Sequence, residues 1–273
     1  MKIALIQQSC TDNKQNNLER GLEAAEEAAK AGAKIICFAE LAFEPFYPQY
    51  KNPADPAAHA EPIPGRITKA FSSLARNYGI IVVLNLYEND GNDLYDSSPV
   101  IDTDGSILGT TRMIHITDYD CFFEKDYYTP GNNGAPVYET EFGNIGVAIC
   151  YDRHYPEYMR ALGVAGADIV FIPQAGAKGE WPEGLYEAEV RTAAFQNGYY
   201  TALCNRVGEE PKLAFSGESF VCDPEGTVIA KAALGTDEIL YCDIDLEMTV
   251  ESHAKRLFYR DRRPELYADW IKE

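Results

Sequence analysis

Basic residues are scarce in this chain. Its 273 residues include 24 lysines and arginines against 43 aspartates and glutamates, which gives a formal net charge of −19 at pH 7. A protein that binds the nucleic-acid backbone needs a basic surface, so this balance argues against a nucleic-acid partner. It says little about the substrate, because net charge mainly governs solubility and association.

Long hydrophobic runs and paired cysteine motifs are also lacking. No apolar stretch approaches the roughly 18 residues of a membrane span, and residues 2–7 resemble a strand rather than a signal peptide. The seven cysteines are an odd number and include no Cys-x-x-Cys pair, so neither a zinc site nor a redox couple is expected. We therefore expect a protein of the reducing cytoplasm without a membrane partner.

The hydrophobic pattern, in contrast, is that of a large α/β core. Hydrophobic residues make up 46% of the chain, and buried-strand runs alternate with helical periodicity in both halves. The expected strands are residues 2–7, 34–39, 79–86, 145–150, 168–172 and 199–204. The expected helices are one through Leu18, Leu22, Ala25 and Ala29 that ends at Gly32, one from Ile63-Pro64-Gly65 to about residue 77, and two more at about 156–165 and 183–197.

The remaining segments complete a single α/β domain, residues 1–273, with strands in the core and helices outside. A hairpin region leads to a strand at 107–112, and residues 113–140 form a long irregular segment, which in compact domains is often functional. Antiparallel strands are expected at 217–222, 227–230 and 239–244, before a charged, partly helical tail at 245–273.

Cys150 differs from the other cysteines in its surroundings. It ends the apolar run of residues 145–150, and a dense polar segment, residues 151–157, follows at once. Open α/β sheets place reacting atoms at the carboxyl ends of strands, and reactive cysteines lie in partly exposed, polar surroundings. These features favour a nucleophile, whereas a buried inert thiol is the alternative. That alternative fits the following cysteines: Cys10, Cys37, Cys204, Cys222 and Cys242.

Glu40 and Glu124 are two acids that could serve this thiol. Glu40 closes the expected strand at 34–39, and a glutamate beside a thiol can take its proton and then activate water. Glu124 has two phenylalanines before it and Lys125 after it, and a carboxylate beside apolar rings has a raised pKa unless it is paired. Taken alone, each residue could equally be a solvated surface glutamate.

Short segments along nearly the whole chain resemble the nitrilase, or carbon–nitrogen hydrolase, superfamily. In order, they are Phe38-Ala39-Glu40, Ile63-Pro64-Gly65, Arg112-x-x-His115-Ile116, Phe123-Glu124-Lys125, Thr129-Pro130-Gly131, Ile149-Cys150-Tyr151-Asp152, Cys204-Asn205-Arg206-Val207-Gly208, Gly217-Glu218-Ser219-Phe220 and Arg262-Arg263-Pro264-Glu265-Leu266-Tyr267. Each piece is weak alone, but the ordered set is specific. The resemblance places Glu40, Glu124 and Cys150 at the family's two glutamates and its nucleophilic cysteine.

Met113 occupies the position of the family's third essential residue. The family's loop reads Arg-Lys-x-His, whereas this chain reads Arg112-Met113-Ile114-His115; Lys125 is no substitute, because the family also has a lysine there. Methionine fills the space of a lysine without its charge or its hydrogen-bond donors. We therefore expect a folded protein with little or no turnover. The intact remainder of the site favours an engineered substitution, and a natural pseudoenzyme is the alternative.

The resemblance also implies an architecture and a mechanism. Family members resemble four-layer α-β-β-α sandwiches that form homodimers or higher homo-oligomers by packing helices together, and the tail at 245–273 would then be a subunit-crossing arm. In the family, the cysteine attacks an amide, carbamoyl or nitrile carbon, ammonia or an amine leaves, and the thioester is hydrolysed. The lysine stabilises the negative charge of the intermediate. No metal and no organic cofactor takes part.

The segment after the nucleophile indicates the substrate class. Residues 150–157 resemble the branch of hydrolases for N-carbamoyl amines and N-carbamoyl amino acids, which includes β-ureidopropionase-like and N-carbamoylputrescine-amidase-like enzymes. Arg153 or His154 could hold a substrate carboxylate, or both could simply pack in their loop. Further candidate substrate contacts, from loops that border the family's pocket, are Tyr47, Tyr151, Gln174 and Trp181.

Other functions remain open from the sequence. A Cys–His hydrolase could pair Cys150 with His115 or His154, although it would leave both glutamates idle. A non-catalytic binder of small molecules is favoured by Met113 alone. An aliphatic amidase, a nitrilase or an acyltransferase of the same superfamily would use the same cysteine.

Overall fold

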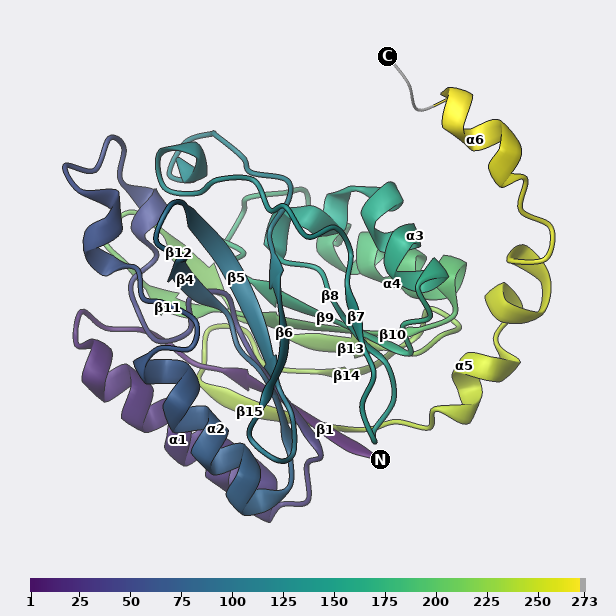
Figure 1. Cartoon of the computed structure of the whole chain (residues 1–273), viewed down its shortest axis with the longest axis horizontal. Helices are drawn as coiled ribbons and strands as arrows, with labels where there is room; N and C mark the ends of the chain where they lie inside the picture. The colour runs from purple at the N-terminus through teal and green to yellow at the C-terminus, as the bar shows by residue number, and fades with distance from the viewer. Residues whose placement is uncertain (271–273) are drawn as a thin grey trace.

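Two β-sheets face each other in the computed structural model, which describes residues 1–270 (Figure 1). Within these residues the first sheet has seven strands, in the order β15-β1-β2-β3-β5-β4 with β6 beside β5, and the second has six, in the order β14-β13-β10-β9-β8-β7. The first comprises β1 (Lys2–Gln7), β2 (Ile35–Phe38), β3 (Ile81–Val83), β4 (Leu86–Asn89), β5 (Leu94–Ile101), β6 (Ile107–Arg112) and β15 (Glu238–Asp243). The second comprises β7 (Val137–Tyr138), β8 (Ile145–Val147), β9 (Ile169–Gln174), β10 (Tyr200–Asn205), β13 (Phe220–Cys222) and β14 (Val228–Lys231).

Helices cover the outer face of each sheet. Helices α1 (Lys14–Lys30) and α2 (Arg66–Tyr78) connect the parallel strands β1, β2 and β3, and α3 (Pro156–Val164) and α4 (Leu185–Asn197) connect β8, β9 and β10. Parallel strands need such crossovers, and the helices bury the strands on both faces.

Three hydrophobic clusters confirm the expected four-layer α-β-β-α sandwich. The largest contains side chains of both sheets, for example Leu5 of β1 and Phe171 of β9, and therefore fills the space between them. A second joins the first sheet to its helices through residues such as Ile36 and Phe71. The third joins the second sheet to α3 and α4. Each sheet thus has one face against the other sheet and one face against helices.

Several strand predictions need correction. The expected strand at 79–86 is two strands, β3 and β4, because the buried Asn85 interrupts it and its side-chain oxygen accepts a hydrogen bond from the Leu41 N–H at 2.8 Å. The expected strand at 239–244 corresponds to β15, which pairs with β1 in the first sheet and not with the strands that precede it in sequence. A short hairpin, β11 (Val207–Glu209) and β12 (Ala214–Ser216), was not predicted.

The tail is largely helical; its first part contacts α4, and its last helix lies away from the two sheets. Helix α5 (Glu247–Glu251) and the π-helical turn Ala254–Phe258 follow β15, and the Tyr259 hydroxyl donates to the Asn197 backbone oxygen of α4 at 3.3 Å. Helix α6 (Pro264–Trp270) then extends away from the two sheets (Figure 1), and none of its residues is buried. Residues 271–273 of the predicted arm lie outside the described residues.

Candidate active site

Cys150 lies at the start of a tight turn and not at the end of its strand as expected. Strand β8 ends at Val147, and Cys150 opens the 3-10 turn Cys150–His154. Its φ is +43°, a left-handed conformation that costs a non-glycine residue roughly 1–3 kcal/mol. Only 5% of the residue is exposed. The strained backbone therefore directs a nearly buried thiol into the space between the sheets.

Two buried acids meet this thiol. Glu40 follows β2, and Glu124 opens the 3-10 turn Glu124–Asp126. One carboxylate oxygen of each glutamate and the Cys150 sulfur all lie within 4.8 Å of one another. Neither glutamate has any exposed surface. Three segments that are far apart in sequence thus supply one compact cluster, as the sequence predicted.

The cluster holds its protons strongly. Burial, followed by the charge of Glu124, raises the pKa of Glu40 to about 8. Burial also raises the pKa of Glu124 well above its usual value, and burial and then the charges of Glu40 and Glu124 do the same to the pKa of the Cys150 thiol. At neutral pH the site therefore contains a thiol rather than a thiolate, and at least one protonated carboxyl group.

No cation pairs with either glutamate among residues 1–270. Both oxygens of Glu40 and Oε1 of Glu124 have no hydrogen-bond partner, and neither residue takes part in an ion pair. Glu124 Oε2 accepts one hydrogen bond, from the Thr117 N–H at 3.2 Å. Lys125, the next residue in the chain, is exposed. The acids thus lack the counter-charge that buried carboxylates usually have.

Met113 is buried directly beyond β6. Its N–H donates to the Asp96 oxygen at 2.9 Å, its own oxygen accepts from the Gly131 N–H at 2.7 Å, and its side chain belongs to the same hydrophobic cluster as Cys150. Hydrogen bonds therefore hold both the N–H and the carbonyl group of residue 113, and an uncharged side chain occupies the position at which the family has its lysine.

Asp96 is a buried acid that the sequence analysis missed. It lies in the middle of β5, its Oδ1 accepts from the Asn85 side chain at 2.5 Å, and its Oδ2 has no partner. Burial, and then the charge of Glu40, raises its pKa well above the usual value. Ser97 and Ser98 follow Asp96 in this strand, so no local pattern marked it as a buried acid.

Arg206 is a second omission, although its motif was recognised. The side chain is almost fully buried, and Nη1 donates to the backbone oxygens of Glu40 (3.0 Å) and Leu41, while Nη2 donates to that of Glu44 (3.1 Å). It also pairs with Glu210. Arg206 therefore fixes the loop that carries Glu40 without pairing with the Glu40 carboxylate.

Polar side chains after Cys150 form one wall of the site. Arg153 Nη1 donates to the Cys150 backbone oxygen and to Gln174 Oε1, both at 2.8 Å. Five buried nitrogens in this wall have no hydrogen-bond partner: Arg153 Nε and Nη2, Gln174 Nε2, His154 Nε2 and Trp181 Nε1. Glu189 lies behind them, 3.6 Å from Arg153 Nε and 2.7 Å from His154 Nδ1. Tyr151 packs edge-to-face on His154. The wall thus contains buried N–H groups without a hydrogen-bond partner.

Tyr47 lies in different surroundings from the rest of the predicted set. Its hydroxyl donates to Glu44 at 3.1 Å, and its ring stacks on His59 at 4.3 Å. Glu180, which was not predicted, accepts hydrogen bonds from the Tyr119 and Tyr186 hydroxyls and from the Ala177 N–H, and it therefore adds a further acid near the wall.

The two histidines proposed as partners of Cys150 are engaged elsewhere. His115 Nδ1 and Asp152 Oδ1 are 2.7 Å apart, and the His115 ring stacks on Tyr155 at 3.5 Å. His154 Nδ1 is held by Glu189 in the same way. Both histidines thus have carboxylate partners, and the buried acids next to the thiol are Glu40 and Glu124.

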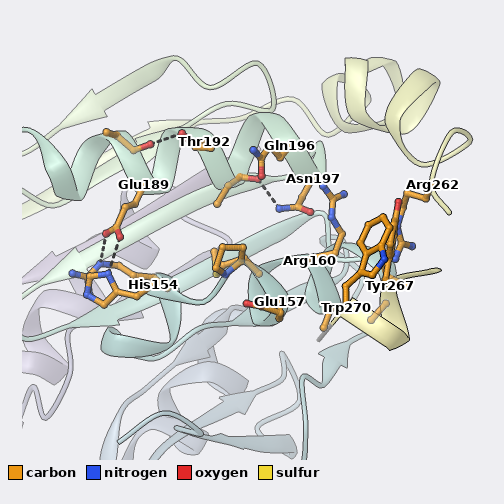
Figure 2. A pocket seen from close by; sticks show the side chains of 18 of the residues that line it. His154, Glu157, Arg160, Glu189, Thr192, Gln196, Asn197, Arg262, Tyr267 and Trp270 are labelled. Atoms are coloured by element: carbon orange, nitrogen blue, oxygen red, sulfur yellow. Dashed lines mark hydrogen bonds and ion pairs between the residues drawn. The ribbon is translucent and has the colours of Figure 1, made fainter. Parts of the chain in front are cut away.

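A separate groove lies outside the cluster. Its cavity, about 1030 Å³, runs between α3, α4 and the tail, and Arg153, His154 and Glu189 are shared with the wall described above. Figure 2 shows His154 and Glu189 at one end of it and Tyr267 and Trp270 at the other. Trp270 is 70% exposed.

A further observation concerns the membrane. In the part of the chain that the structure describes, no helix has both the length and the apolar character needed to cross a bilayer.

Comparisons with known proteins agree with this geometry. The sequence model of the carbon-nitrogen hydrolase family matches residues 2–254. A citrullinase of Francisella tularensis is 33% identical over 100% of this chain and 99% of its own length. An N-carbamoylputrescine amidase of Solanum lycopersicum is 32% identical over 97% of this chain and 93% of its own. The crystal structure of a carbon-nitrogen hydrolase from Helicobacter pylori G27 superposes with a TM-score of 0.92 at 31% identity, covering 100% of this chain and 99% of that one.

Proposed function

The chain belongs to the carbon–nitrogen hydrolase family, and on that premise we propose that its site is built to hydrolyse the C–N bond of a carbamoyl compound or small amide through a thioester on Cys150. The observation that carries this proposal is the convergence of Glu40, Glu124 and Cys150 within 4.8 Å. We further propose that this form is inactive or severely impaired, because Met113 lies where the family has its lysine.

Glu40 is the residue best suited to move protons. Its pKa of about 8 lies close to neutral pH, where a general base is most effective. It would take the Cys150 proton as sulfur attacks the carbonyl carbon, and pass it to the departing nitrogen as the C–N bond breaks. It would then take a proton from the water that attacks the thioester and give it to the Cys150 sulfur as the C–S bond breaks, which restores the free thiol. Glu124 would position the substrate's nitrogen.

Met113 removes the group that would stabilise the intermediate. The tetrahedral intermediate has a negatively charged oxygen, and the methionine thioether can neither donate a hydrogen bond nor carry a charge. Losing a single donor to such an oxygen costs about 10²–10³ in rate, or roughly 2.7–4 kcal/mol. The raised pKa of Cys150 adds to the loss, because less thiolate is available.

The wall of unpartnered donors supports a substrate with an anionic group. Arg153 and Gln174 are joined to each other and border the Cys150 turn, and both keep free N–H groups. A carboxylate would satisfy these donors, so we favour N-carbamoyl amino acids over N-carbamoyl amines, with Arg153, His154, Gln174 and Trp181 as contacts. Among the relatives, one is named for citrulline and another for N-carbamoylputrescine.

We also propose a homodimer or higher homo-oligomer. The groove between α3 and α4 exposes Val164 and Leu185, and Trp270 at its end leaves most of its ring in solvent. A second copy would cover these groups, with the end of the tail, within residues 245–273, as the crossing element. Size-exclusion chromatography with light scattering tests this, and Val164→Glu should shift the protein towards the monomer. A cytoplasmic location fits the seven free cysteines.

A natural non-catalytic binder is the second candidate, favoured by the close fit of Met113 in the core. Both candidates predict binding of carbamoyl compounds, but they differ in the effect of Met113→Lys. If the rest of the machinery is intact, the new ammonium group restores turnover. In a true pseudoenzyme the same change leaves the protein inactive.

The deciding experiment measures ammonia release from a panel of carbamoyl amino acids, carbamoyl amines and simple amides. The chain itself should release little, and the Met113→Lys variant should be at least about 10²-fold faster on one class. Adding Cys150→Ala to that variant should abolish the gain. A Met113→Lys protein that folds and binds but never turns over would refute the hydrolase proposal.

A further inference from the structure

The acids and the thiol of the cluster lie close enough together to serve as ligands of one metal ion. Glu40, Glu124 and Cys150 each offer one ligand atom, and the three atoms lie within 4.8 Å of one another. Zinc binds a thiolate at about 2.3 Å and a carboxylate oxygen at about 2.0–2.2 Å, so tetrahedral ligands lie roughly 3.3–3.7 Å apart. Small side-chain rotations would bring the three atoms to these separations around one ion.

Three of the four carboxylate oxygens in the cluster have no hydrogen-bond partner. Both Glu40 oxygens and Glu124 Oε1 are fully buried without a hydrogen bond, and no ion pair reaches either acid from elsewhere in residues 1–270. Buried acceptors without donors are costly. A divalent ion at the centre of the cluster would bind one oxygen of each glutamate and the Cys150 sulfur at once.

The surroundings support ligation. Glu124 already accepts a hydrogen bond at its second oxygen, from the Thr117 N–H, and Arg206 holds the backbone of Glu40. Such contacts orient ligands and raise metal affinity. Cys150 is 5% exposed, whereas neither glutamate has any exposed surface, so an ion would enter from the side of Cys150.

We propose that Glu40, Glu124 and Cys150 bind a thiophilic divalent ion, best matched by Zn²⁺, in the space where Met113 leaves the acids without an ammonium group. The inference goes beyond the proposed hydrolase function and does not require turnover. One thiolate and two carboxylates suit zinc, because magnesium and calcium prefer oxygen ligands alone. Binding releases the thiol proton, and any carboxyl proton, to solvent. Water would complete the fourth position.

The identity of residue 113 provides the sharpest test. The ammonium group of Met113→Lys would occupy the same space and pair with the acids, and it would repel a metal ion. Met113→Leu is the matched control, because it also changes the side chain but adds no charge. The proposal therefore predicts that the leucine variant binds metal as the parent does and that the lysine variant does not.

The experiment uses the full chain, stripped with a chelator and then dialysed against Zn²⁺ or Co²⁺. We expect one ion per chain by mass spectrometry and a thiolate-to-cobalt charge-transfer absorption. Cys150→Ser should abolish that absorption, and Glu124→Gln should weaken zinc binding by at least about tenfold. Cys121→Ser, a half-buried cysteine outside the cluster, should change neither.

Three results would overturn the proposal. They are no stoichiometric metal in the parent chain, an unchanged cobalt absorption in Cys150→Ser, and equal zinc affinity in the lysine and leucine variants at residue 113. Uptake of a primary ammonium compound in place of metal would also overturn it. The readouts are metal content and absorption rather than turnover. The metal proposal can therefore fail while the hydrolase proposal stands, and the hydrolase proposal can fail while the metal proposal stands.

Discussion

The raised pKa of Glu40 predicts that the free energy of unfolding depends on pH. In the folded protein this carboxyl group keeps its proton up to about pH 8, whereas its ordinary pKa is 4.5. The folded state therefore binds more protons than the unfolded state between these values, and the free energy of unfolding must fall as the pH rises through that window. Glu40→Gln keeps the shape of the side chain and removes this contribution.

The size of the effect follows from the width of the window. One retained proton changes the free energy of unfolding by about 1.4 kcal/mol per pH unit, so Glu40 alone should cost about 3 kcal/mol between about pH 6 and pH 8. The charge of Glu40 also raises the pKa of Asp96 and of Cys150. Its removal lowers those pKa values as well, which flattens the pH dependence further.

Urea unfolding at a series of pH values measures the effect, with a chelator present so that bound metal does not contribute. The parent chain should lose stability steeply between about pH 6 and pH 8, and Glu40→Gln should lose about 3 kcal/mol less over that range. Glu139→Gln, the same change at an exposed site, should retain the parent's slope. Equal slopes in the parent and Glu40→Gln would show that Glu40 is ionised in the folded protein, and the electrostatic description of the cluster would be wrong.

Three further predictions concern single side chains. Alkylation of Cys150 by iodoacetamide should be slow at neutral pH and accelerate only in alkaline solution, because burial and both glutamates raise the pKa of the thiol. Met113→Lys should shift this pH dependence of the alkylation rate, measured by mass spectrometry, to lower pH. An unchanged pH dependence would count against the role of residue 113. In the Met113→Lys background, Arg153→Gln should raise KM for carbamoyl amino acids about tenfold or more while changing kcat less. An equal rise in KM for uncharged amides would rule out a contact between Arg153 and a substrate carboxylate. Arg206→Met should lower the free energy of unfolding in urea by about 3–5 kcal/mol, since it leaves Glu210 and several carbonyl oxygens buried without their partner. A decrease below about 1 kcal/mol would contradict the structural role of Arg206.

The sequence predicted the order of the helices and the main strands because both faces of each parallel strand are buried, which leaves long apolar runs. It also predicted the meeting of Glu40, Glu124 and Cys150, but only through the family resemblance. Spacing alone could not show it, because Glu40 follows a strand of one sheet and Cys150 a strand of the other. The left-handed φ of Cys150 depends on a turn that closes only in the folded chain.

Asp96 and Arg206 were missed because the surroundings of both depend on segments far apart in the chain. A single acid within a strand, such as Asp96, is expected to face water, and its burial is evident only when the second sheet covers it. Arg206 binds backbone oxygens of a loop about 165 positions earlier in the chain, and no local pattern encodes such a partner. Contacts between segments that are far apart in the chain carry no local sequence signature, so buried polar contacts of this kind become visible only in three dimensions.

Charge balance in the cluster connects the hydrolase, the metal and the stability proposals. Buried carboxyl groups next to a thiol must be neutralised by a lysine, by a metal ion or by protons. Met113 removes the first option, so protons remain with Glu40 and Cys150 unless a metal displaces them. Restoring an ammonium group at residue 113 should therefore change three measurements together: turnover should rise, zinc affinity should fall, and the loss of stability towards alkaline pH should become smaller. If these three quantities changed independently, the cluster would not act as one electrostatic unit.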